Sequence, residues 1–528
     1  MSSERYVAKA VGALPFLARF LERVGLRGVI DRIVPKDDQA YLSAAEVTEV
    51  LVANRLASPR PLYRVQDWAD RAGVAQVFHF QAAWLNDDRL GRVLEDLGQN
   101  SQLIRSAVCL AIAREFGIGL KRFHYDLTTV WLQGDYEETH PSDTFHIQYT
   151  KDGKDDPAGK AFRLGVSTFD DGEGAISLAC QVLDGTATTC KSALKNLIEL
   201  KRVIGEKLDN VLQVSDRAGV TAEVVAKTTA EHMQVLGPLT TNEALKRKMR
   251  ELLAAGPMWQ KMSYLSDRQA RKPSDERDAY QAFEVPYSFK HEDQVYPARL
   301  IVVLSDGKRK RDEKSRLKRQ KKIEQRLSDL LEKSRQPRDP RGSKLNLPRN
   351  VEKILATYPE GKLYEVTWAG PAEAPTGFTW KLVSGPKAGD KDLDGIYVAA
   401  TTLPAAHSLD QVFTWLKQQW RVEDSHRILK GRLKVSPVFL HRPDRIEGLI
   451  LVLWMALVTY QLLEREWRKQ TQGTKSARWT TLTLLRLFEG YSYVGVAQAG
   501  GFRWVPCLLP DALRMVFRTM GLRLPDTS

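Results

Sequence analysis

Apolar residues recur three and four positions apart through residues 10–115, which is the spacing of amphipathic helices. The segments are ALPFLARFLERVGL, LSAAEVTEVLVANRL, PLYRVQDWADRAGV and NDDRLGRVLEDL. Ser43 and Asn86 stand at the expected start of two of them, and such side chains cap helix N-termini. We therefore expect residues 1–117 to form an all-α N-terminal domain.

From Lys121 the pattern changes to short apolar runs bounded by Gly and Asp. The runs FHYDLTTVWL, AFRLGVST, AISLACQVLD, NVLQVSD and MQVLGPL predict strands. Helical spacing recurs in KSALKNLIELKRVI and in a segment ending near His232. This order of strands and helices predicts an α/β domain with a mixed sheet over residues 118–240.

Residues 241–405 carry five more β-prone runs: QAFEVPYSF, ARLIVVLS, KLYEVTWAG, GFTWKLVSG and DGIYVAATT. A charged stretch over residues 308–344 divides them, and we expect it to be helical to about Lys333 and loop-like beyond Pro337. A solvated helix and direct contact with DNA phosphates both suit this stretch. Residues 241–405 are thus predicted to be a β-rich insertion with one charged helix.

Helical spacing returns in residues 406–528, through Arg468 and again in WTTLTLLRLF. The longest apolar run, from Leu449 to Leu463, is shorter than the ~20 residues that a membrane span needs. We therefore expect a buried helix there and no membrane association.

The composition favours a polyanionic partner. The chain has 528 residues, enough for two to four compact units, and a formal net charge of +14, which attracts nucleic acid. General basicity without a role remains the alternative. The four cysteines have no C-x-x-C spacing, which argues against a disulfide framework or a zinc site. With no secretory signal at the N-terminus, these features favour the cytoplasm.

Three carboxylates stand where catalytic groups are expected. Asp126 lies within the β-prone run FHYDLTTV, where a buried carboxylate needs a counter-charge such as a metal ion. Asp216 closes the run VLQVS, and strand ends converge on clefts in open sheets. Glu423 lies on a predicted helix. Each aspartate alone would be an ordinary turn or cap residue, and Asp184, in a turn-like DGT context, is the second candidate for the position of Asp216.

Such a set fits phosphodiester chemistry. Two Mg²⁺ ions can stabilise both the attacking and the leaving oxygen, and Mg²⁺ prefers oxygen ligands. Asp126 would bridge both ions, with Asp216 and Glu423 each completing one site. Arg427 and Lys430, one and two helical turns beyond Glu423, would reach a phosphate. An ordinary salt bridge between Glu423 and Arg427 is the alternative.

The glutamate segment resembles that of DDE transposases of bacterial insertion sequences, of the IS-four group. Their signature is Tyr, two residues, Arg, three residues, Glu, six residues, Lys, and Glu423 and Lys430 match it in type and spacing. Leu416 and Gln419 stand in place of the Tyr and the Arg. The segments YDLTTVWLQGD, VLDGTATT, PVF and RIEGL extend the similarity over most of the chain.

The resemblance implies a ribonuclease H-like core, interrupted by the β-rich insertion and preceded by the helical domain. It implies a transposase that binds terminal inverted repeats, cleaves DNA with two Mg²⁺ ions, which Mn²⁺ can replace, and joins the 3′ ends to target DNA. A homodimer in the synaptic complex, associated with the bacterial nucleoid while bound to DNA, is the implied assembly. We expect Arg421 or Arg427 to contact phosphate in place of the missing residues.

The N-terminal helical domain is expected to recognise the DNA ends, together with four basic residues: Lys308, Arg309, Lys310 and Arg311. Two other hypotheses remain open at this stage. One is a ribonuclease H-like nuclease that cleaves without strand transfer, and the other is a catalytically decayed transposon protein that only binds DNA. Trp368 and Trp380 are weaker candidates for stacking on an extruded base, with core packing as the alternative.

Overall fold

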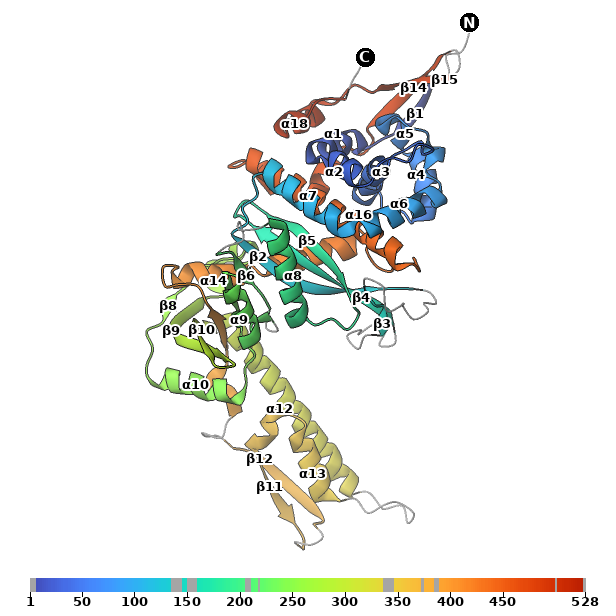
Figure 1. Ribbon diagram of the computed structural model, residues 1–528. Coiled ribbons are helices and arrows are strands. Elements are labelled where there is room, and N and C mark those ends of the chain that lie inside the picture. The colour runs from blue at the N-terminus through green and yellow to red at the C-terminus, as the bar shows by residue number, and fades with distance from the viewer. Residues whose placement is uncertain are drawn as a thin grey trace. The chain divides into compact units, whose positions relative to one another are not determined.

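The computed structural model describes nine segments of the chain (Figure 1), namely residues 6–133, 145–149, 159–204, 210–216, 219–335, 346–371, 375–383, 389–498 and 501–525. By their internal contacts the residues form two units. The first comprises Met1–Gly237, Lys290–Tyr296 and Gln418–Ser528, and the second comprises Pro238–Phe289 and Pro297–Lys417.

The predicted N-terminal helices of the first unit are confirmed. They are α1 (Leu14–Val24), α2 (Leu26–Ile33), α3 (Ala44–Ala57), α4 (Val65–Arg71), α5 (Val74–Phe78), α6 (Asp87–Gln99) and α7 (Ser101–Glu115). Ser43 forms a capping box at the start of α3: its hydroxyl accepts from the Glu46 N–H, and the Glu46 carboxylate accepts from the Ser43 N–H. The Asn86 side chain accepts from the Arg89 N–H at the start of α6. Local polar chemistry therefore places both helix starts.

The first unit contains the predicted mixed sheet. Its strands are β2 (Arg122–Trp131), β3 (Gln148–Tyr149), β4 (Lys160–Asp170), β5 (Ala175–Leu183), β6 (Leu212–Val214) and β7 (Gln234–Pro238). β4 pairs antiparallel with β2 along one edge and with β5 along the other, and the short β3 pairs with one end of β4. β6 is parallel to both β2 and β7. The main order is therefore β5-β4-β2-β6-β7.

Helices cover both faces of this sheet. Successive strand residues point to opposite faces, and two neighbours on β4 show which helix lies on each. Ser167 accepts a hydrogen bond from Asn196 of α8 (Thr189–Ile204), whereas Thr168 bonds the hydroxyl of Ser425 on α15 (Trp420–Arg427). The α15 face is the face on which Asp126 stands, because Asp126 is paired with Val166 on β4. The predicted helix near residue 232 is α9 (Ala222–Ala230).

The apolar run from Leu449 to Leu463 lies within α16 (Pro443–Gln470), the only helix in the described residues that is long and apolar enough to cross a membrane. Its most apolar window is entirely buried, and the helix packs on β5, α3 and α6. The prediction of a buried helix is confirmed. The predicted continuous helix from Ser408 to Arg468 is wrong, since residues 433–442 are not helical and Val438 forms a parallel bridge with Leu132.

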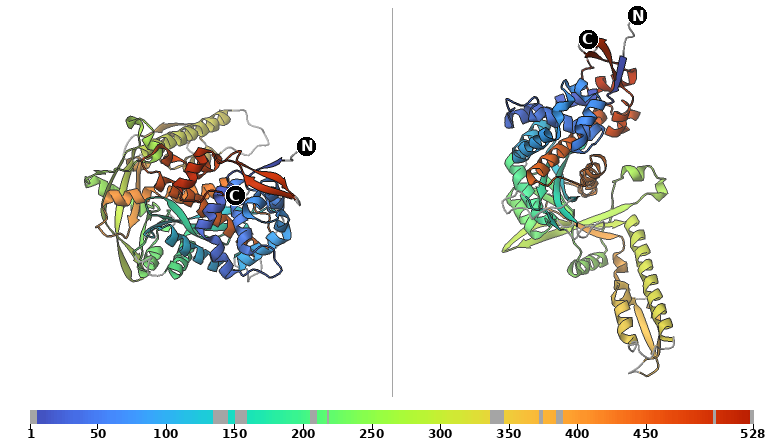
Figure 2. Two further views of the ribbon diagram at one scale, coloured as in Figure 1. Left: turned by 90° about the horizontal axis from the view of Figure 1, so that it is seen from above. Right: turned by 90° about the vertical axis from the view of Figure 1, so that its right-hand side faces the viewer.

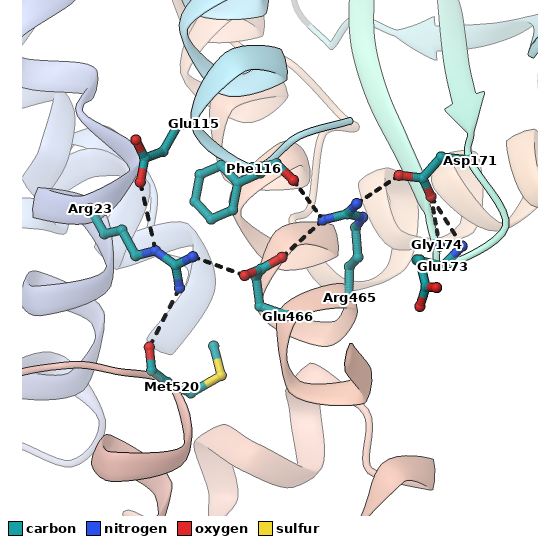
Figure 3. Close-up of polar contacts among 9 residues, drawn as sticks. All are labelled: Arg23, Glu115, Phe116, Asp171, Glu173, Gly174, Arg465, Glu466 and Met520. Atoms are coloured by element: carbon teal, nitrogen blue, oxygen red, sulfur yellow. Dashed lines mark hydrogen bonds and ion pairs between the residues drawn. The ribbon is translucent and has the colours of Figure 1, made fainter. Parts of the chain in front are cut away.

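The N-terminal helices are tied to the sheet by a chain of ion pairs and hydrogen bonds (Figure 3). Arg465 on α16 bonds the carboxylates of Asp171, in the turn after β4, and Glu466, at 2.6 and 2.9 Å, and the Phe116 carbonyl at 3.1 Å. Glu466 in turn accepts from Arg23 of α1 at 2.9 Å. Arg465 and Glu466 are both almost fully buried. Each buried charge in this series of ion pairs therefore has a partner of opposite charge.

Three elements near the ends of the chain form a small sheet that the sequence pattern did not reveal. β1 (Tyr6–Ala10) pairs antiparallel with β14 (Ser492–Gln498), which pairs with β15 (Gly501–Pro506). The expectation of an entirely helical segment over residues 1–117 is therefore wrong at its start. α17 (Thr481–Arg486) is the predicted helix in WTTLTLLRLF, and α18 (Asp511–Thr519) follows β15.

The second unit contains all five predicted strands of residues 241–405. In sheet order, β13 (Ile396–Thr401), β10 (Gln294–Ser305), β9 (Tyr280–His291) and the short β8 (Gln260–Lys261) are neighbours. β11 (Tyr364–Ala369) and β12 (Gly377–Leu382) form a separate hairpin. Residues 241–405 are more helical than expected, since α10 (Glu243–Ala254), α11 (Asp267–Ala270) and α13 (Leu347–Ala356) accompany the strands. α14 (Leu409–Lys417) falls where a helix was predicted.

The charged helix is confirmed as α12 (Asp306–Arg335), whereas the loop expected beyond Pro337 falls in residues 336–345, outside the described residues. α12, α13 and the β11–β12 hairpin lie together (Figure 2) around a core of their own. That core consists of Ile323, Leu327, Leu330, Leu347, Val351, Leu363, Tyr364 and Phe378. We refer to residues 306–394 as the arm. Trp380 packs against this core, in agreement with the packing alternative, whereas Trp368 contacts Phe378 but is 39% exposed.

Candidate active site

Asp126 occupies the middle of β2 and faces α15. Its Oδ1 accepts a hydrogen bond of 2.8 Å from the Leu127 N–H, and its side chain is 24% exposed. Burial, together with the charges of Asp216 and Glu423, raises the pKa of Asp126 to about 6 against the opposing effects of the Leu127 N–H and of Arg163. Because the charges of Asp216 and Glu423 both act on Asp126, the three carboxylates lie near enough to one another to interact electrostatically.

Asp216 follows β6, the strand beside β2. Because His124 is in register with Val214, the chain leaves the sheet at Asp216 next to the middle of β2. The turn after the strand is held by the Gly219 N–H, which donates to both the carboxylate and the carbonyl of Asp216 at 3.1 Å. Asp184, the second candidate, instead accepts from the N–H of His146 at 2.7 Å, in the turn after β5.

Glu423 lies in the first turn of α15, on the exposed side of that helix. The alternative salt bridge between Glu423 and Arg427 is not formed, because Arg427 pairs with Asp424 at 2.5 Å. The charge of Glu423 acts on the carboxyl group of Asp126. Among the described residues, no three His, Cys, Asp or Glu side chains lie close enough together to hold one metal ion.

His426, one helical turn after Glu423, also points to this site. Its Nδ1 lies 3.7 Å from Oδ2 of Asp126, and its side chain is 12% exposed. Burial, together with the charge of Lys430, lowers the pKa of His426 to about 4, so the imidazole is neutral at neutral pH. The sequence analysis did not single out His426, although its spacing from Glu423 places both side chains on one helix face.

The basic residues near Glu423 differ in their surroundings. Lys430 lies in a π-helical turn over Ile428–Arg432 and is exposed, and partial desolvation lowers its pKa. Arg427 is largely exposed. The Arg421 side chain, expected to contact phosphate, is only 15% exposed and forms an ion pair of 3.0 Å with the buried Asp170. Arg421 therefore holds α15 against the end of β4.

A second set of contacts holds the buried side of α15 against the sheet and α16. The fully buried hydroxyl of Ser425 lies 3.2 Å from the Thr168 hydroxyl and 3.0 Å from the Ser177 hydroxyl. It also accepts a hydrogen bond of 2.9 Å from the Gln461 side chain on α16. Ser425 thus joins α15 to β4, β5 and α16. Because Glu423 and His426 flank it, these bonds set the rotation of the helix that presents both.

The four basic residues of α12 belong to the second unit. Arg309, Lys310 and Arg311 are exposed, and Lys308 pairs with Asp312 one turn along the helix. The helix holds 13 Lys and Arg residues against six Asp and Glu residues, a net charge of +7. Half of the net charge of the whole chain, +14, therefore lies on this one helix.

We compared the chain with protein families, solved structures and curated proteins. The model of a family described only as a domain of unknown function, DUF4277, matches residues 6–104. Among solved structures, the chain is similar to a piggyBac transposase synaptic complex with hairpin DNA, at 9% identity and a TM-score of 0.38, over 96% of this chain and 86% of that one. No curated protein matches the chain.

Two solved structures of the Mos1 transposase match a smaller part of the chain. The paired-end complex with the left transposon end matches at 12% identity and a TM-score of 0.15, over 42% of this chain and 75% of that one. The pre-cleavage transpososome matches at 12% identity and a TM-score of 0.16, over 42% and 68%.

Proposed function

We propose that this chain is a DDE-type DNA transposase that binds the ends of a mobile element, cleaves DNA there and transfers the strands to target DNA. The observation that supports this most is the placement of Asp126, Asp216 and Glu423. They come from a central strand, from the end of the neighbouring parallel strand and from a helix on the same face of the sheet. Carboxylates in such an arrangement suit metal-assisted attack on a phosphodiester.

The sheet supports the same proposal. Its order β5-β4-β2-β6-β7, with only β4 antiparallel, is the order expected for the proposed ribonuclease H-like core. We propose that the second unit is an insertion into this core, between β7 and α15. Residues 290–296, around the turn between β9 and β10, are an exception because they belong to the first unit. The helical residues before β2 and the basic α12 are the proposed DNA-binding elements.

The donor set fits Mg²⁺. Burial and the charges of Asp216 and Glu423 raise the pKa of Asp126, and a bound cation would favour the ionised carboxylate. Oxygen ligands are those that Mg²⁺ prefers. Two proposed sites share Asp126, one with Asp216 and the other with Glu423, so that each site needs only a pair of carboxylates. Mg²⁺ commonly binds through one or two carboxylates, water and substrate phosphate. When bound, the ions would stabilise charge on the attacking and leaving oxygens.

The residues of the chain would then position the substrate. Lys430, near His426 at the end of α15, is proposed to bind a phosphate of the cleaved strand. Arg421 would act indirectly by holding α15, whereas Arg427 is exposed enough to contact the backbone of DNA. Water would be the nucleophile for cleavage, and the released 3′-hydroxyl would be the nucleophile for strand transfer.

The test uses purified full-length protein and labelled DNA that carries the sequences flanking the reading frame, with Mg²⁺ or with EDTA. We expect nicking at the element ends and joined products, and loss of both to background in Asp126→Ala and Glu423→Ala. Asp424→Ala is the matched control, because Asp424 adjoins Glu423 but pairs with Arg427. This variant should retain activity.

Each other result identifies an alternative. Cleavage without joined products would favour a nuclease that lacks strand transfer. DNA binding without any cleavage by the wild type would favour a decayed DNA-binding protein. Cleavage that survives both the Asp126 and Glu423 substitutions would show that other carboxylates perform the reaction.

A further inference from the structure

The buried imidazole of His426 is a polar group at the carboxylate site that the proposed mechanism does not use. Its Nδ1 is turned toward Oδ2 of Asp126 at 3.7 Å. Its Nε2 is buried and has no hydrogen-bond partner among the described residues. Burying a polar group without a partner costs free energy.

The distance to Asp126 distinguishes two roles for the ring. A hydrogen bond from Nδ1 to the carboxylate would bring the two atoms to about 2.7–3.2 Å, so none is formed at 3.7 Å. Nitrogen and oxygen ligands that each lie about 2.1 Å from a shared cation are about 3.0–3.6 Å apart. The observed separation needs only a slight closing to hold an ion between the two atoms.

We propose that Nδ1 of His426 is a metal ligand beside Asp126 and gives this site a preference for Mn²⁺ over Mg²⁺. The inference rests on the proposed function, since it concerns the same metal site. Imidazole is a softer ligand than carboxylate, and Mg²⁺ favours sites made only of oxygen. A site that includes an imidazole among its ligands therefore binds Mn²⁺ better than a site made of carboxylates alone.

The first measurement is metal binding by the full-length protein, with Mn²⁺ followed by electron paramagnetic resonance and Mg²⁺ by calorimetry. In His426→Gln, which keeps a polar side chain of similar size, we expect the Mn²⁺ affinity to fall by about tenfold or more and the Mg²⁺ affinity by less than about threefold. His426→Asp supplies an oxygen ligand, and should move the preference from Mn²⁺ toward Mg²⁺.

The matched control is His232→Asn. His232 is exposed in the turn after α9 and has φ of 56°, a conformation that Asn tolerates. Its substitution should change neither affinity. Thermal unfolding followed by circular dichroism shows whether His426→Gln still folds. A second measurement tests the ligand directly in the wild type. Pulsed electron paramagnetic resonance of bound Mn²⁺ should show coupling to an imidazole nitrogen, which His426→Gln should abolish.

Two results would overturn the inference while the proposed function stands. One is wild-type Mn²⁺ binding that depends on Asp126 but shows no nitrogen coupling. The other is an equal loss of affinity for both ions in His426→Gln, which would mean that His426 only positions Asp126. By contrast, identical metal binding by the wild type and Asp126→Asn would overturn the proposed function and this inference together.

Discussion

At the scale of single residues, the most consequential property of the molecule is the raised pKa of the buried Asp126 carboxyl group. The pKa of this group is about 6 rather than its ordinary 3.8, because burial and the charges of Asp216 and Glu423 disfavour its ionised form. A difference of that size corresponds to about 3 kcal/mol between the two protonation states. The free protein therefore carries an energetic cost at the site that a bound cation would remove.

A pH dependence of stability follows. The folded protein binds the Asp126 proton more tightly than the unfolded chain, so the contribution of this group to stability falls as the pH rises from about 4 to about 6 and stays low above that. We expect Asp126→Asn to stabilise the protein by about 2–3 kcal/mol at pH 8 and by little near pH 4. Urea unfolding in EDTA at the two pH values measures this.

The control for this experiment is Asp424→Asn, whose carboxylate pairs with the largely exposed Arg427. It should give no gain at pH 8. An increase in the stability of Asp126→Asn that is the same at both pH values would show that packing, and not ionisation, distinguishes the variant from the wild type.

Single residues also show which parts of the candidate site could be predicted from the sequence. Asp126, Asp216 and Glu423 were identifiable because an acidic residue within or just after an apolar run is conspicuous. The ion pair of Arg421 with the buried Asp170 could not be predicted, because the two residues are about 250 positions apart in the chain. His426 was hidden for a different reason. A histidine in a charged helix has no distinguishing pattern until the neighbouring strand shows which face is buried.

At the scale of secondary-structure elements, α15 depends on its buried polar contacts more than on its length. Eight residues make a helix too short to be stable alone. Val422 and Ser425 are its buried residues, and the hydroxyl of Ser425 contacts β4, β5 and α16 at once. Removing that hydroxyl would leave buried donors and acceptors on three other elements short of a partner.

We therefore expect Ser425→Ala to destabilise the protein by about 1–3 kcal/mol and to weaken metal binding at the site. The matched control is Asp424→Ala, the preceding residue on the same helix, which loses only an exposed ion pair and should cost less than about 1 kcal/mol. Urea unfolding and Mn²⁺ titration of the two variants make the comparison. Equal effects in both would mean that Ser425 does not anchor α15.

Elements with strong local patterns were predictable, and elements defined by distant partners were not. The strands from β2 to β7, apart from the two-residue β3, stand out as apolar runs because helices cover both faces of their sheet. β1 was missed because it has only five residues and its partner β14 lies almost 500 positions away. The break between α15 and α16 arises from the pairing of Val438 with the end of β2, which no local pattern reveals.

At the scale of the whole molecule, positive charge is concentrated in the arm. α12 carries a net charge of +7 and buries only three of its side chains, Ile323, Leu327 and Leu330. Those three belong to the separate arm core. At the base of the arm, the N–H of Ser305 donates to the carbonyl of Gly395 at 3.0 Å, and the N–H of Asp306 donates to the carbonyl of Ala279 at 3.2 Å. Asp392 of the arm also pairs with the half-exposed Arg250 of α10 at 2.8 Å. The arm is therefore built as an accessory to that sheet.

Because Ser305 and Gly395 end the antiparallel neighbours β10 and β13, the arm can be replaced by a short turn. We expect a variant that lacks residues 306–394, with Asn-Gly joining the two strands, to fold and to bind metal like the wild type. Its DNA affinity should depend less on salt. The slope of log K against log[salt] should fall in magnitude by about 2 or more, since each phosphate contact contributes about 0.9.

A second variant separates charge from shape. Replacing the exposed Lys314, Lys318 and Lys321 by Gln leaves the arm core and the helix propensity of α12 intact. If the arm binds DNA through its charge, this variant should show part of the reduced slope with an unchanged thermal unfolding profile. A slope equal to that of the wild type in both variants would mean that the charge of α12 faces solvent and that the DNA-binding surface lies elsewhere on the chain.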